Sequence, residues 1–226
     1  MKLQQSDILY EDNHLIAINK MAGIPSQGDE SGDTSCFEMV KNYIREKYNK
    51  PGEIYLGLLH RIDRPVSGVL LMGKTSKATS RMNKLFLDRE ITKIYHATIE
   101  LLPEKHDGTL VHYLIKDQDA NKSKAYNKEV KYSKKAELSY SLLGHLGRSS
   151  LLEIKPKTGR HHQIRVQLAK LNMHIIGDVK YGASKGNSDR SICLHAQSLE
   201  FIHPVKKEKI TIKAPYPQTQ AWEIFE

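Results

Sequence analysis

The sequence is poor in cysteine and has no long apolar run, and each of these absences removes a class of protein. Two cysteines, Cys36 and Cys193, occur in 226 residues, and neither belongs to a CxxC pair. Zinc ribbons and redox dithiols are therefore not expected, and a reducing intracellular setting fits. The first residues do not form a signal peptide, and no stretch approaches the roughly 18 apolar residues of a membrane-spanning helix. We expect a cytoplasmic protein that has no membrane partner.

Motifs that bind nucleotide cofactors or activate a serine are also missing. The sequence has no GxxxxGK[ST] phosphate loop, no GxGxxG after a predicted strand and no GxSxG turn. His161 and His162 are adjacent, and neighbouring side chains on a helix diverge by about 100°, which is poor geometry for chelation. We therefore expect neither a nucleotide cofactor nor a metal site.

No repeat, low-complexity block or linker divides the chain. We expect one domain, residues 1–226, which can be divided into two lobes. We also expect the protein to be a monomer. A chain of this length can bury about 70% of the surface that its unfolded form exposes, so it needs no disulfide or metal for stability.

Hydrophobic periodicity predicts three main helices. The first begins near Thr34, where Ser35 and Glu38 form a capping box, and ends before Pro51. The second follows Ser76 as its N-cap. In the third, which starts just after Gly159, apolar residues recur at helical spacing and Arg165 lies at the edge of that apolar stripe; the residues of the stripe are Ile164, Leu168 and Leu171.

Strands outnumber these helices and rarely alternate with them, so we expect a mixed α+β fold and not a doubly wound sheet. The residues of segment 68–74 are apolar on both faces, as in a strand that is covered on both sides. In segment 94–101, Tyr95 shares a face with Ala97 and Ile99. Further strands are expected at 8–10, 15–20, 54–59, 136–143 and 150–156, and around 176–182, 192–204 and 208–215.

The charge balance favours a polyanionic partner. Lys and Arg number 35 against 26 acidic residues, a formal charge of +9, which promotes binding to nucleic acid through counterion release. Segment 115–135 carries seven lysines against three acids, with two tyrosines between them. Because this mixture suits phosphates and stacked bases, we expect RNA contacts from Lys122, Lys124 and Lys128.

The sequence HRIDR places a charged cluster between two apolar runs, where unpaired charges are seldom found. Asp63 lies between Arg61 and Arg64, and Arg160 and Arg165 follow on another segment. One interpretation is a carboxylate in a structural ion-pair network. The other is a carboxylate that a nearby arginine keeps ionised so that it can act as a nucleophile. The spacing alone does not decide between these two interpretations.

The motifs around this cluster resemble those of one enzyme family. HRIDRPVSGVLLMGKT is similar to the signature HRLDxxTSGLLLxAK of the RluA family of RNA pseudouridine synthases, with Ile62 and Val66 as mild departures. ILYEDNHLIAINKMAGIPS resembles the opening of that family, although Met21 replaces the usual proline and Ser26 ends the stretch without the usual histidine. KIYHATIE, KTGRHHQIRVQLA, IGDVKYG and LHAQSLEFIHP match the remaining blocks in the same order.

The resemblance implies the pseudouridine synthase fold, a mixed and largely antiparallel sheet with helices outside and a basic cleft across its middle. It covers nearly the whole chain, and the opening strand begins within ten residues of Met1. The chain therefore resembles the short branch of the family, which lacks an N-terminal S4 domain. The implied activity is conversion of uridine to pseudouridine, which needs no cofactor, in structured RNA such as 23S ribosomal RNA or transfer RNA.

The resemblance also implies roles for individual residues. Asp63 matches the catalytic aspartate, which either attacks the ribose or promotes loss of the base. Arg165 matches the arginine that pairs with this carboxylate, and Tyr95 matches the tyrosine that stacks on the target base and can remove its C5 proton. A uridine must leave the base stack to react, and Arg61 matches the arginine that fills the vacated space.

The remaining site residues are expected to contact RNA. His60 is expected mainly to position the loop, and Lys20, Arg64 and Arg160 are expected to contribute to the basic cleft. An alternative of another class is a catalytically idle RNA-binding or ribosome-assembly protein with the same fold. Its sequence would be expected to alter Asp63, Tyr95 or Arg165, and all three are present. Neither the RNA nor the modified uridine follows from the sequence, because shape and loop recognition dominate RNA readout.

Overall fold

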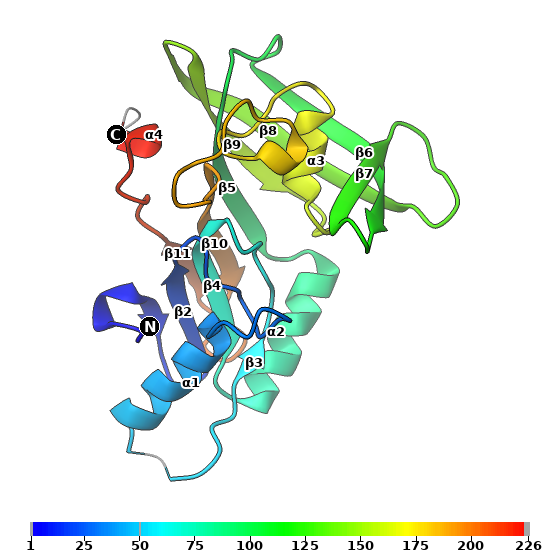
Figure 1. The fold of residues 1–226 in the computed structure, drawn as a ribbon. Helices are drawn as coiled ribbons and strands as arrows, with labels where there is room; N and C mark the ends of the chain where they lie inside the picture. Colours follow the sequence, from blue (N-terminus) through cyan, green and yellow to red (C-terminus); the bar gives the residue numbers. More distant parts are fainter. Residues whose placement is uncertain (1, 50, 224–226) are drawn as a thin grey trace. The chain divides into compact units, whose positions relative to one another are not determined.

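The computed structural model describes residues 2–49 and 51–223 and has the expected mixed α+β class (Figure 1). Its helices are η1 (Gln5–Asp7), α1 (Cys36–Lys47), α2 (Ser76–Asp88), α3 (Gln163–Ala169), η2 (Val179–Tyr181) and α4 (Gln220–Glu223). Its strands are β1 (Ile8–Glu11), β2 (Leu15–Lys20), β3 (Gly57–Leu58), β4 (Ser67–Gly73), β5 (Thr92–Ile99), β6 (Asp107–Asp117), β7 (Lys122–Tyr126), β8 (Lys134–Leu146), β9 (Ser149–Pro156), β10 (Leu194–Ile202) and β11 (Lys209–Lys213).

The described residues form two compact units. Unit 1 consists of those within Met1–Thr92 and Ala196–Tyr216, and unit 2 of those within Lys93–His195 and Pro217–Glu226. The expectation of one domain over residues 1–226 stays a prediction. In the part of the chain that the structure describes, no helix is long and apolar enough to cross a membrane.

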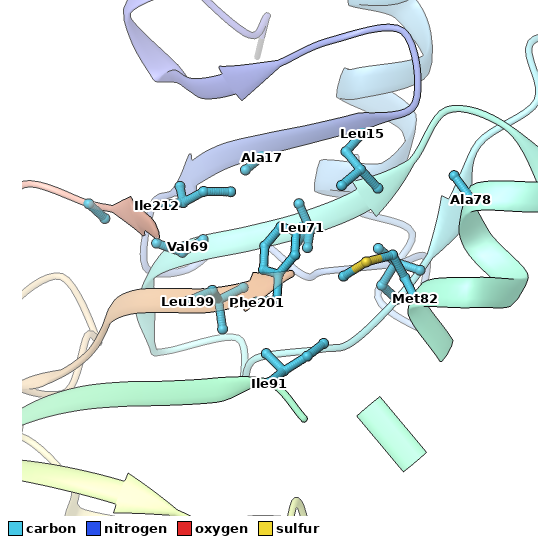
Figure 2. Packing of buried hydrophobic residues seen from close by; sticks show 12 residues of the cluster. Leu15, Ala17, Val69, Leu71, Ala78, Met82, Ile91, Leu199, Phe201 and Ile212 are labelled. Carbon is cyan, nitrogen blue, oxygen red and sulfur yellow. The ribbon is translucent and has the colours of Figure 1, made fainter. Parts of the chain in front are cut away.

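In unit 1 a sheet is covered by a helix on each face. The strand order is β1-β2-β4-β10-β11, with β3 also paired to β4. On β4, Val69 and Leu71 join a core cluster that contains Ala78 and Met82 of α2 (Figure 2). The alternate residues of β4 pack in a second cluster against α1; these are Leu70 and Met72. The prediction that this strand is buried on both faces is therefore confirmed, since all seven of its residues are buried.

The helix caps in unit 1 follow from local sequence. Ser35 caps α1 and exchanges hydrogen bonds with Glu38, so the expected capping box is confirmed. The second helix differs slightly from the prediction, because the Thr75 hydroxyl accepts from Ala78 N and Ser76 is the first helical residue. Both residues can cap a helix, and the extended backbone at Thr75 determines which one does.

In unit 2 an antiparallel sheet has the strand order β5-β9-β8-β6-β7. The lysine-rich segment 115–135 supplies the end of β6, the whole of β7 and the start of β8, and Ile115 lies opposite Lys124 in the β6–β7 hairpin. Val166 of α3 packs on this sheet with Leu114 and Ala136.

Two predictions in unit 2 were wrong in detail. The helix expected just after Gly159 begins only at Gln163, because His162 adopts a left-handed conformation with φ 51°. Leu171, expected in the apolar stripe, lies beyond the helix and is exposed. The strand expected around 176–182 is instead the single turn η2, which ends at Gly182 with φ 99°.

Candidate functional site

A short loop of unit 1 carries the HRIDR sequence. The flanking strands β3 and β4 pair in an antiparallel arrangement, and residues 59–66 connect them. Ile62 and Val66 are buried, whereas Asp63 is half-buried and Arg61 is exposed. The apolar side chains therefore anchor the loop in the core and leave the carboxylate at its surface.

Lys20, the last residue of β2, lies beneath this loop and is only 1% exposed. Its ammonium donates hydrogen bonds to the main-chain carbonyls of Met21 and Arg64, each over 3.1 Å, and of Val66 over 2.7 Å. A lysine is rarely buried this deeply. Here the three carbonyls replace its water shell, and two of them belong to the loop that carries Asp63.

Burial lowers the pKa of Lys20 from 10.5 to about 8, and electrostatic interactions with Cys36 and Asp63 oppose this shift. Burial also raises the pKa of the Cys36 thiol to about 11, so this thiol is uncharged at neutral pH. Asp63 is then the acidic side chain whose charge acts on the ammonium. The deep burial of Lys20 disfavours the direct RNA contact that we predicted for this residue.

Two residues that follow β2 also bind the loop backbone. The hydroxyl of Ser26 donates to Ile62 O over 2.8 Å and accepts from Ile62 N over 3.3 Å. Gly23 N donates to Arg64 O over 2.8 Å. We call Lys20, Gly23 and Ser26 the loop clamp, because together they hold the main chain on both sides of Asp63.

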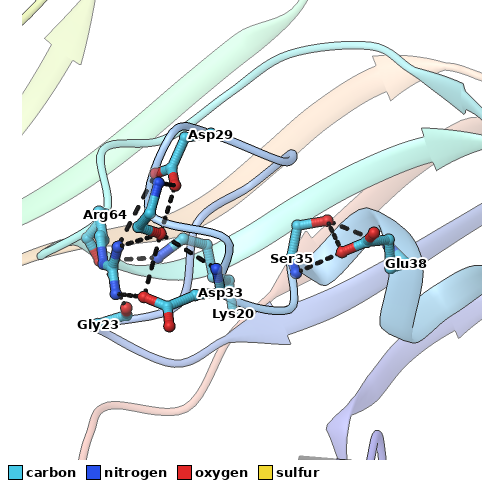
Figure 3. A network of polar contacts seen from close by, with 8 residues as sticks. Lys20, Gly23, Asp29, Asp33, Ser35, Glu38 and Arg64 are labelled. Atoms are coloured by element: carbon cyan, nitrogen blue, oxygen red, sulfur yellow. Dashed lines mark hydrogen bonds and ion pairs between the residues drawn. The ribbon is translucent and has the colours of Figure 1, made fainter.

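Arg64 reaches back over the clamp to an acidic segment (Figure 3). Its Nε donates to Gly23 O over 2.8 Å and its Nη1 to Ser31 Oγ over 3.0 Å. Its guanidinium also forms ion pairs with Asp33 and, at 3.8 Å, with Asp29. These contacts engage Arg64 within unit 1, and an RNA contact by this residue stays a prediction.

His60 is held between a strand and a helix. Its Nε2 accepts a hydrogen bond from Leu71 N over 3.0 Å, and its ring stacks on Phe86 with centroids 5.3 Å apart. Because Nε2 is an acceptor, the neutral ring carries its proton on Nδ1. This geometry suits a positioning role, and contacts of His60 or the exposed Arg61 with RNA stay predictions.

Tyr95 and Arg165 belong to unit 2. Tyr95 is half-buried in β5, opposite Ile154 of β9. Arg165, expected at the edge of a helix face, is buried with 5% exposure. Its Nε and Nη2 donate to the two carboxylate oxygens of Asp178 over 2.7 and 2.8 Å. This two-pronged pairing fixes the plane of the guanidinium, because both prongs must be satisfied together.

Asp178 and Tyr181 are functional candidates that the sequence analysis missed. Asp178 is 2% exposed, and Arg165 lies over the Tyr181 ring at 5.0 Å from its centroid. The Tyr181 hydroxyl in turn accepts from Ser123 N over 2.7 Å and lies 2.9 Å from His162 Nδ1. Both residues fall in the IGDVKYG block, whose match to the family could have marked them as candidates. Their spacing from Arg165 in the sequence did not show that they contact it.

The β6–β7 hairpin is attached to the segment before α3. The Ser123 hydroxyl donates to His161 O over 2.7 Å, and the His161 ring contacts Asn121 with Nε2 3.1 Å from Oδ1. Lys180 adds a hydrogen bond to Asn121 O over 3.1 Å. The β6–β7 hairpin, which we also call the lysine-rich hairpin, is therefore anchored at its tip to the segment that precedes α3, the helix that carries Arg165.

The predicted RNA-binding cations of unit 2 differ in their surroundings. Lys122 is half-buried and Lys128 is exposed, whereas Lys124 is exposed but lies 3.7 Å from Asp117. Arg160 is exposed and donates through Nε to Lys135 O over 3.1 Å. Their contacts with RNA stay predictions.

The paired histidines show no sign of a metal centre. The rings of His161 and His162 stack with centroids 3.8 Å apart, so they do not converge on one point. Burial, followed by the charge of Arg165, lowers the pKa of His162 to about 2. Across residues 2–49 and 51–223, no three His, Cys, Asp or Glu side chains are grouped so that they could hold a metal ion.

The loop clamp thus holds the main chain on both sides of Asp63 within unit 1. Asp178 holds the Arg165 guanidinium within unit 2. The structure brings Asp63 together with Lys20 and Arg64, and it joins Arg165 to the base of the lysine-rich hairpin through Tyr181. The pairing of Asp63 with Arg165 stays a prediction from the family resemblance.

Comparisons with known proteins agree on one family. The family described as RNA pseudouridylate synthase matches residues 14–170. The chain is 35% identical over 92% of its length to a ribosomal large subunit pseudouridine synthase C of Buchnera aphidicola, of which it spans 66%. It is 32% identical over 97% of its length to a tRNA pseudouridine synthase C of Vibrio vulnificus, of which it spans 95%.

A solved structure gives the same result for the fold. The human RNA pseudouridylate synthase domain containing 4 superposes with a TM-score of 0.79 at 24% identity, covering 94% of this chain and 89% of that one. The expected fold is confirmed.

Proposed function

The chain belongs to the RNA pseudouridylate synthase family, and from this premise we propose that it isomerises uridine to pseudouridine in ribosomal or transfer RNA, with Asp63 as the reacting carboxylate. Relatives named for ribosomal large subunit RNA and for tRNA match the chain at similar identity. The proposed substrate class therefore includes both ribosomal and transfer RNA.

The reaction exchanges one glycosidic bond for another. The bond between N1 of the base and C1′ of the ribose breaks, the base turns, and C5 bonds to C1′. The proton on C5 is then lost and N1 gains one, so atoms and charge balance without an oxidant or a group donor. This chemistry needs a carboxylate near C1′ and a group that can accept the C5 proton.

The loop clamp is the observation that carries the assignment of Asp63. A group that forms or assists a bond must be held in place before the substrate arrives. The main chain at Ile62 and Arg64, on either side of Asp63, is bonded to Ser26, Gly23 and Lys20. These contacts stabilise a polar residue at a fixed position on a short loop, which supports a catalytic role over a loose surface carboxylate.

Tyr95 and Arg165 are proposed for the same reaction. Tyr95 has the flat ring that stacks on a base and a phenol that can take the C5 proton. Arg165 is held rigidly by Asp178, which supports a role in orienting an anionic group. Arg61, exposed on the loop, is proposed to fill the space that the uridine leaves when it turns out of the stack.

We also propose where the enzyme acts, its oligomeric state and its need for cofactors. It acts in the cytoplasm as a monomer, and the isomerisation uses no cofactor. An RNA modified while structured must reach the loop by base flipping, which costs a few kcal/mol, and binding to the basic segments offsets this cost.

The test is a comparison of pseudouridine maps. Total RNA is mapped from cells with the gene, from cells without it, and from deletion cells that carry either wild-type or Asp63→Asn protein. We expect at least one site in ribosomal or transfer RNA to disappear on deletion, to return with the wild type, and to stay absent with the variant. An unchanged map on deletion would overturn the function, and a site restored by Asp63→Asn would overturn the role of Asp63.

Purified protein separates catalysis from folding. Asp63→Asn keeps the size of the side chain and deletes its charge, so the variant should fold and bind the RNA identified by mapping. Its rate should fall by several orders of magnitude. The matched control is Asp107→Asn, which removes an exposed carboxylate of β6 and should leave the rate unchanged.

A further inference from the structure

An open pocket of unit 2 is lined partly by side chains that the proposed reaction does not use. It has a volume of about 360 Å³ and lies between β7, the end of α3 and η2. We call it the β7–α3 pocket. Its lining includes Lys122, Ala125, Val166, Ala169, Lys170 and Tyr181.

One side of the β7–α3 pocket is apolar and built from small side chains. Ala125 of β7 and Ala169 of α3 are half-buried and pack against the core cluster that contains Val166. Small side chains leave a shallow apolar surface that a flat ring can cover, and covering it is favourable in proportion to the apolar area removed from water.

Two lysines stand beside this apolar surface. Lys122 reaches over the Tyr181 ring, with its Nζ 5.1 Å from the centroid, and Lys170 follows the last residue of α3 and is exposed. Within the described residues neither forms an ion pair with a carboxylate, although nearby lysines do; Lys124 pairs with Asp117 and Lys155 with Glu153. No acidic residue lines the pocket.

An apolar surface with two lysines in the same pocket lining is complementary to a nucleotide. The phosphate would neutralise the two ammonium groups, and the base would cover the apolar side chains. A purely apolar ligand would leave the lysines unused, and a free phosphate would leave the apolar surface exposed. The pocket volume falls at the small end of the range for ligand sites, about 300–1,000 Å³.

The position of Tyr181 favours the RNA substrate as the source of such a nucleotide. This ring is a wall of the β7–α3 pocket, and it is also the ring over which the Arg165 guanidinium lies. Tyr181 therefore contacts both the pocket and Arg165, the arginine that is proposed to take part in the reaction. Because the lysine-rich hairpin forms another wall, the nucleotide should belong to the same RNA chain as the reacting uridine.

We propose that the β7–α3 pocket binds a second nucleotide of the RNA substrate, distinct from the uridine that reacts, with its base on Ala125, Val166 and Ala169 and its phosphate at Lys122 and Lys170. The inference rests on the proposed function and deepens it, because it adds a subsite for the RNA. Contacts at such a subsite would help to select the RNA by the nucleotides around its target.

The test uses adenosine 5′-monophosphate as the probe, since its base is not the one that reacts. The full chain is labelled at alanine and valine methyl groups, and their NMR signals are followed during titration. We expect saturable shifts of the signals of Ala125, Val166 and Ala169. Inorganic phosphate should move these signals less and adenosine alone should bind more weakly, because each carries one half of the recognised chemistry.

Three variants make the test specific. Ala169→Leu fills the pocket and should abolish the shifts, whereas Ala120→Leu, on the exposed turn before β7, should not. Lys122→Gln with Lys170→Gln should weaken binding roughly tenfold, the range for loss of charge-assisted hydrogen bonds. The control with the same loss of charge is Lys155→Gln with Lys157→Gln, whose lysines pair with Glu153 and Glu137, and it should retain the affinity.

The outcomes separate this inference from the proposed function. Shifts that persist in Asp63→Asn protein, and that fail in Ala169→Leu protein, support the subsite whether or not the chain makes pseudouridine. No shift of the three methyl signals, or equal shifts with inorganic phosphate alone, would overturn it even if the enzyme is active. A lysine control that weakens binding as much as the test pair would also overturn it, since general charge would then explain the result.

Discussion

The ammonium of Lys20 donates a hydrogen bond to the main-chain carbonyl of Val66 over 2.7 Å, although the two residues are 46 positions apart. Together with its bond to Arg64 O, this contact places a buried cation under the part of the loop that follows Asp63. The position of a loop carboxylate thus depends on a side chain that is out of reach of solvent.

Lys20→Met should separate the loop clamp from general stability. Methionine fills a similar space but leaves three main-chain carbonyls without their donor, so the free energy of unfolding should fall by roughly 2 kcal/mol. The maximal rate should fall more than RNA affinity, because the loop loses its fixed geometry and not its charged surface. Urea unfolding and single-turnover kinetics measure the two effects.

Lys77→Met is the matched control for that variant, because Lys77 is exposed on α2. It should change neither the stability nor the rate by a measurable amount. A Lys20→Met protein with wild-type rate and stability would show that the hydrogen bonds to the loop are dispensable.

The buried Lys20 should also make stability depend on alkaline pH. Burial lowers its pKa from 10.5 to about 8 in the folded protein, so between these values the unfolded chain binds more protons than the folded one. The free energy of unfolding of the wild type, relative to Lys20→Met, should therefore rise from pH 8 to pH 10.5, by about 3 kcal/mol in all. A flat difference across this window would mean that Lys20 keeps an ordinary pKa.

Asp178→Asn should leave the buried Arg165 guanidinium without its carboxylate. Removing one partner of a buried ion pair costs about 3–5 kcal/mol, whereas replacing both partners with apolar residues can be nearly neutral. We therefore expect a large loss of stability in the single variant and recovery in Arg165→Met with Asp178→Leu. The double variant should stay inactive, and an active double variant would remove Arg165 from the mechanism.

Tyr95→Phe should keep the ring that stacks on the base and remove the phenol. We expect cleavage of the original glycosidic bond to proceed and formation of pseudouridine to stall, as followed by product analysis of a quenched reaction. Tyr55→Phe, at a tyrosine that is 49% exposed, is the control. Full turnover by Tyr95→Phe would reduce Tyr95 to a stacking surface without affecting the family assignment.

Charge removal in the lysine-rich segment should flatten the salt dependence of RNA binding. Changing Lys122, Lys124 and Lys128 to Gln should lower the slope of log affinity against log salt by roughly 0.7 for each lost single-strand phosphate contact. Lys124 should contribute least, because Asp117 already lies 3.7 Å from it. The control variant changes the same number of exposed lysines in unit 1, namely Lys77, Lys207 and Lys213. An unchanged slope in the test variant would place the three lysines off the interface, and an equal slope change in the control would mean that general charge explains the result.

Local patterns in the sequence predicted the parts of the fold that depend on neighbours in the chain. Ser35 and Glu38 stand three apart and cap α1, and the apolar run of β4 is buried on both faces. Both follow from periodicity and capping chemistry alone. The order of the family motifs predicted the fold as a whole.

The features that were missed depend on contacts between distant segments. The left-handed backbone at His162 delays α3, and nothing in the residues before it requires that conformation. The pairing of Arg165 with Asp178 joins a helix to the loop before η2, and spacing carries no information on such a pair. Lys20 was expected in the basic cleft from its place in the first family motif, and only tertiary packing reveals that it is buried.

The anchored hairpin also bears on the entropy of RNA binding. A lysine-rich segment that is unstructured when free must be ordered when it binds, and fixing one backbone residue costs about 1–2 kcal/mol. The tip of the β6–β7 hairpin is already held by His161 and Lys180. Much of that ordering is therefore completed when the chain folds, and more of the attraction between its lysines and the RNA remains available as affinity.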